Sequence, residues 1–107
     1  MPVINLEYDD SQISEKDVKL LSEAIRNIVS NVTHIEDVFV YANSAKIKIK
    51  TAPIEIFVRM SDWKIKDQDV LMNEIKSRLK EWKQENNFKY LINLTLIPMN
   101  WKIEIGI

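Results

Sequence analysis

The sequence has 107 residues, of which 46% are hydrophobic and 29% are charged, and this composition fits one soluble globular domain with a modest core. A net charge of -1 gives no field that attracts nucleic acid or a membrane surface, and the absence of cysteine excludes disulfides and thiolate chemistry. The single glycine, Gly106, excludes glycine-rich phosphate loops.

The remaining bulk features narrow the class further. One histidine and no cysteine leave only carboxylates as metal ligands, and their spacing indicates no metal site. We therefore expect no cofactor. The chain opens with no basic region followed by an apolar run, and no stretch is long and apolar enough to span a bilayer. We expect a single cytoplasmic domain over residues 1–107.

The first eight residues predict a strand that begins next to a proline. Apolar side chains alternate from Val3 to Tyr8, and proline is tolerated at the first residue of a strand. If Met1 is removed, the Pro2 nitrogen becomes a secondary amine that can take up or release a proton. If Met1 is retained, the same nitrogen is an amide without basicity.

A helix and a strand follow. Ser14 is the predicted N-cap, and the helix is expected to run to about Ser30 with Asn31 as its terminator. Its apolar residues recur at helical spacing: Val18, Leu21, Ile25, Ile28 and Val29. After a connector that carries His34, residues 37–42 read as the second strand.

Residues 46–50 alternate lysine and isoleucine without exception. Strict alternation predicts a half-buried strand or ribbon arm with one lysine face. That face has two interpretations, namely contact with an anionic partner or solvation of a sheet edge that prevents edge-to-edge pairing.

The second half repeats the order of the first. Residues 54–60 form the next predicted strand, and Asp67 is the N-cap of a helix that runs to about Asn86. Its buried stripe is expected to contain Leu71, Ile75, Leu79 and Trp82. Residues 91–97 predict a strand that Pro98 closes, and residues 102–105 predict a short last strand.

The two halves share landmarks that indicate an internal repeat of about residues 1–50 and 51–107. Lys16-Asp17, Leu21 and Ile25 precede Lys66-Asp67, Leu71 and Ile75 by about fifty positions. Two β-α-β units predict an α+β two-layer sandwich, in which right-handed crossovers place both helices on one face of a mixed four-stranded sheet.

The predicted sheet has two unlike faces. One face of every strand is aliphatic and should lie under the helices, as in Ile4 and Leu6. The other mixes apolar with charged residues: Val3, Asn5, Glu7, Phe39, Tyr41, Glu55, Phe57, Arg59, Leu91 and Ile97. Such a mixture is typical of a subunit interface, so we expect a homo-oligomer.

These features together resemble the tautomerase superfamily, the group of 4-oxalocrotonate tautomerase and macrophage migration inhibitory factor. The resemblance covers the whole chain and rests on Met1-Pro2 opening a strand, the two β-α-β units, Pro53 at the start of the second unit and the short last strand. The segment Pro53-Ile54-Glu55-Ile56 also resembles small bacterial members. The resemblance implies a homotrimer with the sheets inside, the helices outside and residues 101–105 extending a neighbour's sheet.

The resemblance also implies a chemistry. Family members use an N-terminal proline as general base or acid, which moves a proton between carbon and oxygen of a small enol or α-keto acid. The resemblance assigns that role to Pro2 in this chain. For the cation that holds the substrate carboxylate we expect Arg59, with Arg26 and Lys46 as further candidates, and Asn93 resembles a pocket-lining position.

The sequence departs from the family pattern in two places. Members often carry a cation just after the first helix, where this chain has Asn31, Val32 and Thr33, and the glycines usual near the pocket are missing. Arg59 also has a purely structural interpretation, as the ion-pair partner of Glu55 or Glu7.

Three functions therefore remain open. The first is a proline-based tautomerase or isomerase acting on a small keto-enol carboxylate. The second is a trimeric binding or scaffold protein of the same fold without that chemistry. The third is a ferredoxin-like module for a small ligand, because β-α-β-β-α-β is also the element order of that fold.

Overall fold

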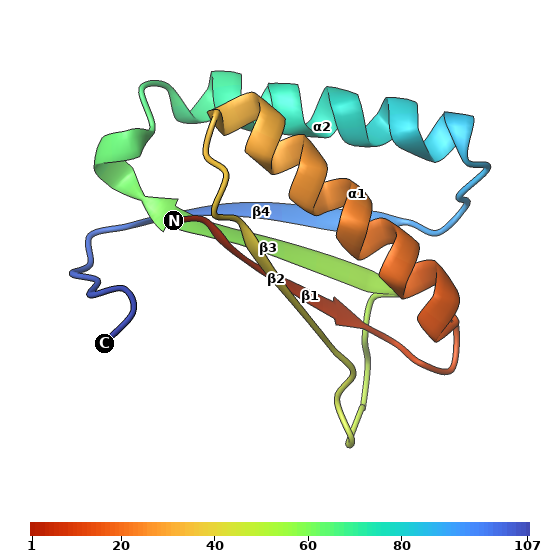
Figure 1. Cartoon of the computed structure of the whole chain (residues 1–107). Coiled ribbons are helices and arrows are strands. Elements are labelled where there is room, and N and C mark those ends of the chain that lie inside the picture. Colours follow the sequence, from red (N-terminus) through yellow and green to blue (C-terminus); the bar gives the residue numbers. More distant parts are fainter.

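Two β-α-β units follow each other along the chain and build two layers (Figure 1). The computed structural model describes residues 1–107. The elements are β1 (Val3–Tyr8), α1 (Glu15–Thr33), β2 (Phe39–Asn43), β3 (Ile54–Ser61), the short 3-10 helix η1 (Asp62–Lys64), α2 (Gln68–Glu85) and β4 (Ile92–Met99). Both helices cover the same face of the sheet, as the repeat predicted (Figure 1).

The sheet has the strand order β2-β1-β3-β4. Within each unit the two strands are parallel neighbours, and the central strands β1 and β3 are antiparallel. A split β-α-β arrangement would place another strand between the two strands of a unit. The adjacency seen here therefore rules out the ferredoxin-like alternative.

Side-chain caps fix the start of each helix, as predicted. The Ser14 hydroxyl accepts a hydrogen bond from the backbone N–H of Asp17 at 3.2 Å. The Asp67 carboxylate accepts from the N–H groups of Asp69 and Val70, at 3.0 and 3.1 Å. Each cap satisfies N–H groups that have no partner within the helix.

The predicted end of the first helix is wrong by a few residues. Asn31 stays helical, and α1 continues to Thr33. His34 ends the helix because it adopts the left-handed conformation, with φ of 58°, and turns the chain toward β2. The loop histidine of the sequence analysis is thus the C-cap of α1.

The core lies between the helices and the aliphatic face of the sheet, as expected. Ile4 and Leu6 of β1 and Ile56 and Val58 of β3 are fully buried there. The apolar residues of β4 on the same face are only half-buried, and these are Ile92, Leu94 and Leu96. The core is therefore closed over the two central strands and thinner at the β4 edge.

The predicted strand or ribbon at residues 46–50 is absent. β2 ends at Asn43 and β3 begins at Ile54, so these residues lie in a connection that projects from the sheet (Figure 1). Ile47 and Ile49 are 84% and 100% exposed. Alternation alone forms no strand when no neighbouring strand lies alongside to accept its hydrogen bonds.

The C-terminal end also differs from its prediction. Pro98 does not close β4 but lies within it, opposite Met60. Proline is tolerated there because β4 is an edge strand, whose outer side needs no N–H donor. Residues 102–105 form no strand, since the chain leaves the sheet after Met99 (Figure 1). Neither helix is long and apolar enough to cross a membrane.

Candidate functional site at the start of the central strand

The face of the sheet opposite the helices presents three rows of side chains. The strand register aligns them across β2, β1, β3 and β4 in turn. From the Pro2 end of the sheet, the rows are Phe39, Val3, Arg59 and Ile97; then Tyr41, Asn5, Phe57 and Thr95; then Asn43, Glu7, Glu55 and Asn93. This mixed face has no second layer of its own chain over it (Figure 1).

Pro2 directly precedes β1, a central strand, and its side chain is fully buried. Its carbonyl oxygen accepts a hydrogen bond from the Phe39 N–H at 3.2 Å, which fixes the start of β1 against β2. Met1 is only half-buried. The ring is thus held by the fold, while the residue attached to its nitrogen reaches the surface.

Arg59 lies at the same end of the sheet as Pro2, because it pairs with Val3. Its guanidinium donates a hydrogen bond to the Asn5 side-chain oxygen and lies 5.8 Å from the centre of the Phe57 ring. Both contacts hold the cation on the mixed face. The ion pair with Glu55 or Glu7 is not formed, since the ion pairs of the structure involve Lys48 alone.

The other predicted site residues lie elsewhere in the chain. Asn93 donates to the Glu55 carboxylate at 3.3 Å and is four β4 positions from the Arg59 row, which corresponds to about 13 Å along a strand. Lys46 lies in the exposed connection after β2, beyond that far end. Arg26, on α1, donates to the Glu36 carbonyl at 3.1 Å. Within one chain, only Arg59 shares the Pro2 end.

Comparison with known proteins decides the fold. No protein-family model and no curated protein matches the sequence. Solved structures match over nearly the whole chain. The 5-carboxymethyl-2-hydroxymuconate delta-isomerase has a TM-score of 0.66 and 12% identity, covering 99% of this chain and 89% of its own. The F6 fused 4-OT wild-type asymmetric trimer has a TM-score of 0.66 and 11% identity, covering 97% and 92%.

A third structure, a domain of unknown function from Sebaldella termitidis ATCC 33386, has a TM-score of 0.61 and 14% identity, covering 100% of this chain and 98% of its own. The chain has the tautomerase-superfamily fold. Identities this low establish the fold alone, and structures of this fold include both enzymes and a domain without assigned function.

In this tautomerase-like fold, a contact that the sequence did not indicate closes the Pro2 end. The Trp101 indole N–H donates to the hydroxyl of Ser61, at 2.7 Å, and Ser61 is itself buried at the end of β3. The contact ties the segment after β4 to the end of the sheet where Arg59 lies. Trp101 gave no periodic signal, because it follows the last strand as a single aromatic residue.

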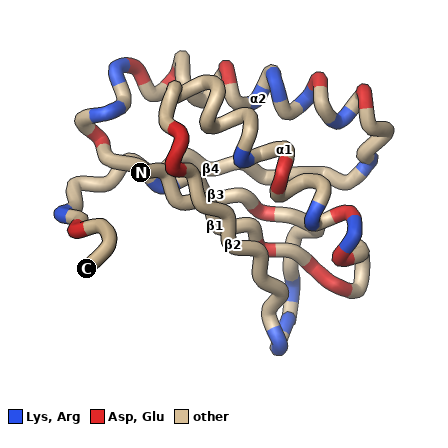
Figure 2. Tube along the Cα trace, viewed as in Figure 1, with Lys and Arg blue, Asp and Glu red and all other residues tan.

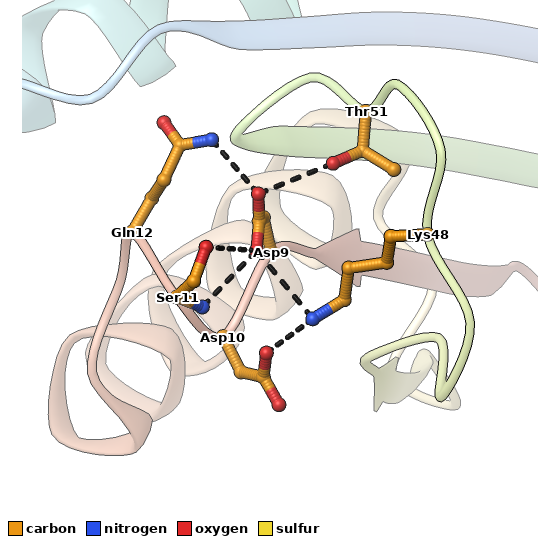
Figure 3. Close-up of polar contacts among 6 residues, drawn as sticks. All are labelled: Asp9, Asp10, Ser11, Gln12, Lys48 and Thr51. Carbon is orange, nitrogen blue, oxygen red and sulfur yellow. Dashed lines mark hydrogen bonds and ion pairs between the residues drawn. The ribbon is translucent and has the colours of Figure 1, made fainter.

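The opposite end of β1 carries a polar cluster around Asp9 (Figure 3). The buried Asp9 carboxylate accepts hydrogen bonds from the Ser11 hydroxyl at 2.7 Å, the Gln12 amide at 2.8 Å and the Thr51 hydroxyl at 3.2 Å. These bonds, that of Ser11 foremost, hold the pKa of Asp9 well below its ordinary value. The sequence had indicated only a turn here.

Lys48 joins the same cluster from the connection between β2 and β3 (Figure 3). Its ammonium forms ion pairs with Asp10 and, at 3.4 Å, with Asp9. The hydrogen bond to Asp10 raises the pKa of Lys48. Lys48 therefore anchors the connection. This lysine, two residues after the predicted cation Lys46, thus has a structural role. No group of histidine, aspartate and glutamate side chains in the structure is arranged to hold a metal ion.

Proposed function

We propose that this protein is a tautomerase or isomerase that moves a proton in a small keto-enol carboxylate, with Pro2 as the general base once Met1 is removed. One observation carries the proposal: Pro2 directly precedes a central strand of a tautomerase-like sheet, and the cation Arg59 lies in the row that begins with the next residue, Val3. The delta-isomerase of the same fold is named for a carboxylated hydroxymuconate, which supports this class of substrate.

The surroundings of the Pro2 nitrogen determine whether it can act as a base. Removal of Met1 turns the Pro2 nitrogen into a secondary amine at the end of a buried ring. Burial of the ring disfavours the protonated form of the amine, which lowers its pKa and makes a neutral base available. The amine takes the proton from the carbon next to the substrate carbonyl, and its conjugate acid returns a proton at the other position of the enol system.

Arg59 holds the substrate and stabilises charge. A guanidinium binds a carboxylate through two parallel hydrogen bonds and lowers the energy of the enolate that develops. Asn5 keeps Arg59 on the mixed face while no substrate is bound, and a substrate carboxylate replaces that amide oxygen as acceptor.

We propose a homotrimer in which the mixed faces meet. Phe39 and Tyr41 are 43% and 57% exposed in the single chain, and such aromatic residues are enriched in subunit interfaces. Asn93 and Lys46 lie at the far end of their own sheet. They can line a pocket at Pro2 only if that Pro2 belongs to a neighbouring copy. The trimeric fused 4-OT supports this assembly. Light scattering on the eluted protein should give three times the chain mass, and a monomer at micromolar concentration contradicts the assembly.

The test of Pro2 begins with the intact mass of untagged protein, which should lack Met1. Enol-keto exchange of phenylpyruvate is then compared in wild type, Pro2→Ala and Pro53→Ala. General-base catalysis contributes about a hundredfold or more, so Pro2→Ala should lose about that factor in kcat. Pro53 opens the second repeat unit and is internal, so Pro53→Ala is the matched control and should keep the rate.

Equal rates for wild type and Pro2→Ala, or retention of Met1, would overturn the catalytic proposal and favour a binding or scaffold role for the same fold.

Arg59→Gln should raise KM for the carboxylated substrate about tenfold or more, since a charged hydrogen-bond partner is lost. Arg78→Gln, at an exposed arginine of α2, is the control for the change in net charge.

A further inference from the structure

Within the single chain, a hollow lies away from Pro2, between α2 and the edge strand β4. Its volume is about 510 Å³, within the range of small-molecule sites, which is about 300–1,000 Å³. Its apolar part consists of Met72 and Leu79 of α2, Leu91 just before β4, and Ile92 and Leu94 of β4, and Asn93 also lines it. Leu94 pairs with Ile56, whereas the Arg59 row meets β4 at Ile97, so the hollow faces the far half of the sheet.

The hollow exists because α2 closes the core incompletely. Only Ile75 and Leu79 are buried on this helix, although it is 18 residues long. Leu91 is 74% exposed, and Ile92 and Leu94 are half-buried. Apolar side chains thus remain open to solvent along one groove, beside the outer edge of β4.

One sign of charge surrounds this groove. Lys76, Lys80 and Lys83, which line it, follow one another at helical spacing along α2. Figure 2 shows that acidic residues alternate with the basic ones along this helix, but none of the acidic residues lines the groove. The adjoining hollow at the end of α2 continues the groove, shares two of these lysines and adds Lys89. Neither hollow is lined by an acidic residue, although the chain has 16 acidic and 15 basic residues.

The lysines are available to a ligand to different degrees. Lys83 is half-buried and donates to the Tyr90 carbonyl at 2.6 Å, which fixes one end of the row. Lys76 and Lys80 are exposed and form no ion pair. The apolar groove therefore carries two free ammonium groups and a third that is already positioned.

We propose that this groove binds an anionic amphiphile, an unbranched aliphatic chain that ends in a carboxylate. The chain covers the apolar residues at the start of β4, and the carboxylate accepts hydrogen bonds from Lys76 and Lys80. A neutral amphiphile leaves the ammonium row unmatched, and a small anion leaves the apolar surface exposed. The ligand is a free molecule rather than a membrane surface, because the apolar residues line a hollow of about 510 Å³.

Titration calorimetry with sodium decanoate below its micellar concentration tests the site in the assembled protein. Saturable binding is expected, and Lys76→Gln/Lys80→Gln should weaken it about tenfold or more, through loss of the charged hydrogen bonds. Lys16→Gln/Lys19→Gln changes the net charge equally at exposed positions of α1 outside the groove and should leave the affinity unchanged. Equal affinities for the two double variants would overturn the proposal.

Two comparison ligands test whether the groove recognises both the charge and the aliphatic chain of decanoate. Decyltrimethylammonium has the same chain with the opposite charge and should not bind, and acetate should bind at least tenfold more weakly than decanoate. Equal binding of decyltrimethylammonium would overturn the proposal, as would association only with vesicles of anionic phospholipid and not with free decanoate.

Two further pairs of variants separate this groove from the rest of the molecule. Leu91→Ser should weaken decanoate binding, while Val70→Ser, at another exposed apolar residue near the start of α2, should not. Pro2→Ala and Arg59→Gln should bind decanoate as wild type does. Loss of binding in those two variants would place the ligand at the Pro2 end and overturn this site without affecting the tautomerase proposal.

Discussion

The two repeat units have the same element order but close the core to different degrees. α1 buries six residues, which are Val18, Leu21, Ala24, Ile25, Ile28 and Val29, whereas α2 buries Ile75 and Leu79. Leu21 is fully buried, and Leu71, its counterpart in the repeat, is only half-buried. The first unit thus supplies most of the helical core, and the second leaves an open groove beside β4.

The units also differ in the polar residues that follow their first strands, and again the first unit is more tightly connected. After β1 the chain forms the Asp9 cluster, which ties the turn before α1 to the connection that precedes β3 (Figure 3). After β3 the corresponding residues form η1, whose N-cap Ser61 makes no side-chain capping hydrogen bond. A repeated topology therefore fixes where strands and helices lie, while local side chains decide which unit carries stability and which remains open for ligands.

The largest expected difference concerns the helix stripes. Leu21→Ala should lower the free energy of unfolding by about 3 kcal/mol, because it leaves a cavity under α1. Leu71→Ala should cost about half as much, since solvent already reaches that side chain. Urea unfolding of both variants measures the difference. Equal losses would show that α2 closes the core as well as α1, and would break the contrast between the units.

For the helix caps we expect the opposite ranking, with the larger loss of stability in the second unit. Asp67 accepts two backbone N–H bonds and carries a charge that favours the helix N-terminus, whereas Ser14 accepts one. Asp67→Ala should therefore cost about 1–2 kcal/mol and Ser14→Ala about 1 kcal/mol or less. Thermal unfolding followed by circular dichroism measures both. A larger loss for Ser14→Ala would contradict the ranking.

The smallest effect is a difference in acid sensitivity. The pKa of Asp9 is lowered in the folded protein from an ordinary value of 3.8, so below about that pH the unfolded chain binds more protons than the folded one. The stability that Asp9 contributes is present above that pH and is lost as the pH falls further. Asp9→Asn should flatten the stability profile below pH 4, measured by urea unfolding at several pH values.

Asp62→Asn is the matched control from the second unit, and its profile should follow wild type. If the stability of Asp9→Asn falls with pH as steeply as that of wild type, the hydrogen bonds around Asp9 do not cause the loss of stability below pH 4. The comparison needs no assumption about catalysis, because the cluster lies at the end of β1 opposite Pro2.

Much of the architecture was predictable from local signals. The caps Ser14 and Asp67, the stripe of α1 and the aliphatic strand faces all depend on the chemistry and spacing of neighbouring residues, and the structure confirms them. Of the four residues predicted for the stripe of α2, Ile75 and Leu79 are buried, and Leu71 and Trp82 are only partly buried. The placement of Pro2 before β1 followed from the same alternation. The roles of Pro2, Arg59, Asn93 and Lys46 in binding or catalysis stay predictions, which the variants above test.

The errors in the predicted strands share one cause. Residues 46–50 and 102–105 alternate as strands do, yet neither segment has a neighbouring strand in its own chain, and both lie outside the sheet. The pairing of residues 101–105 with a neighbouring subunit stays a prediction. Conversely, Pro98 was expected to end a strand and lies inside one, because β4 is an edge. Pairing is a property of the assembled sheet, and the alternation of one segment carries no information about it.

The sequence by itself determined the two helices, the repeat and the two unlike faces of the sheet, since each follows from periodicity along a single segment. Only the tertiary structure decided that Arg59 lies beside the Pro2 end while Asn93 and Lys46 lie at the other, and that α2 leaves a lysine-lined groove. The physical reason is that strand register and helix packing join residues far apart in the chain, and no local pattern sets either of them.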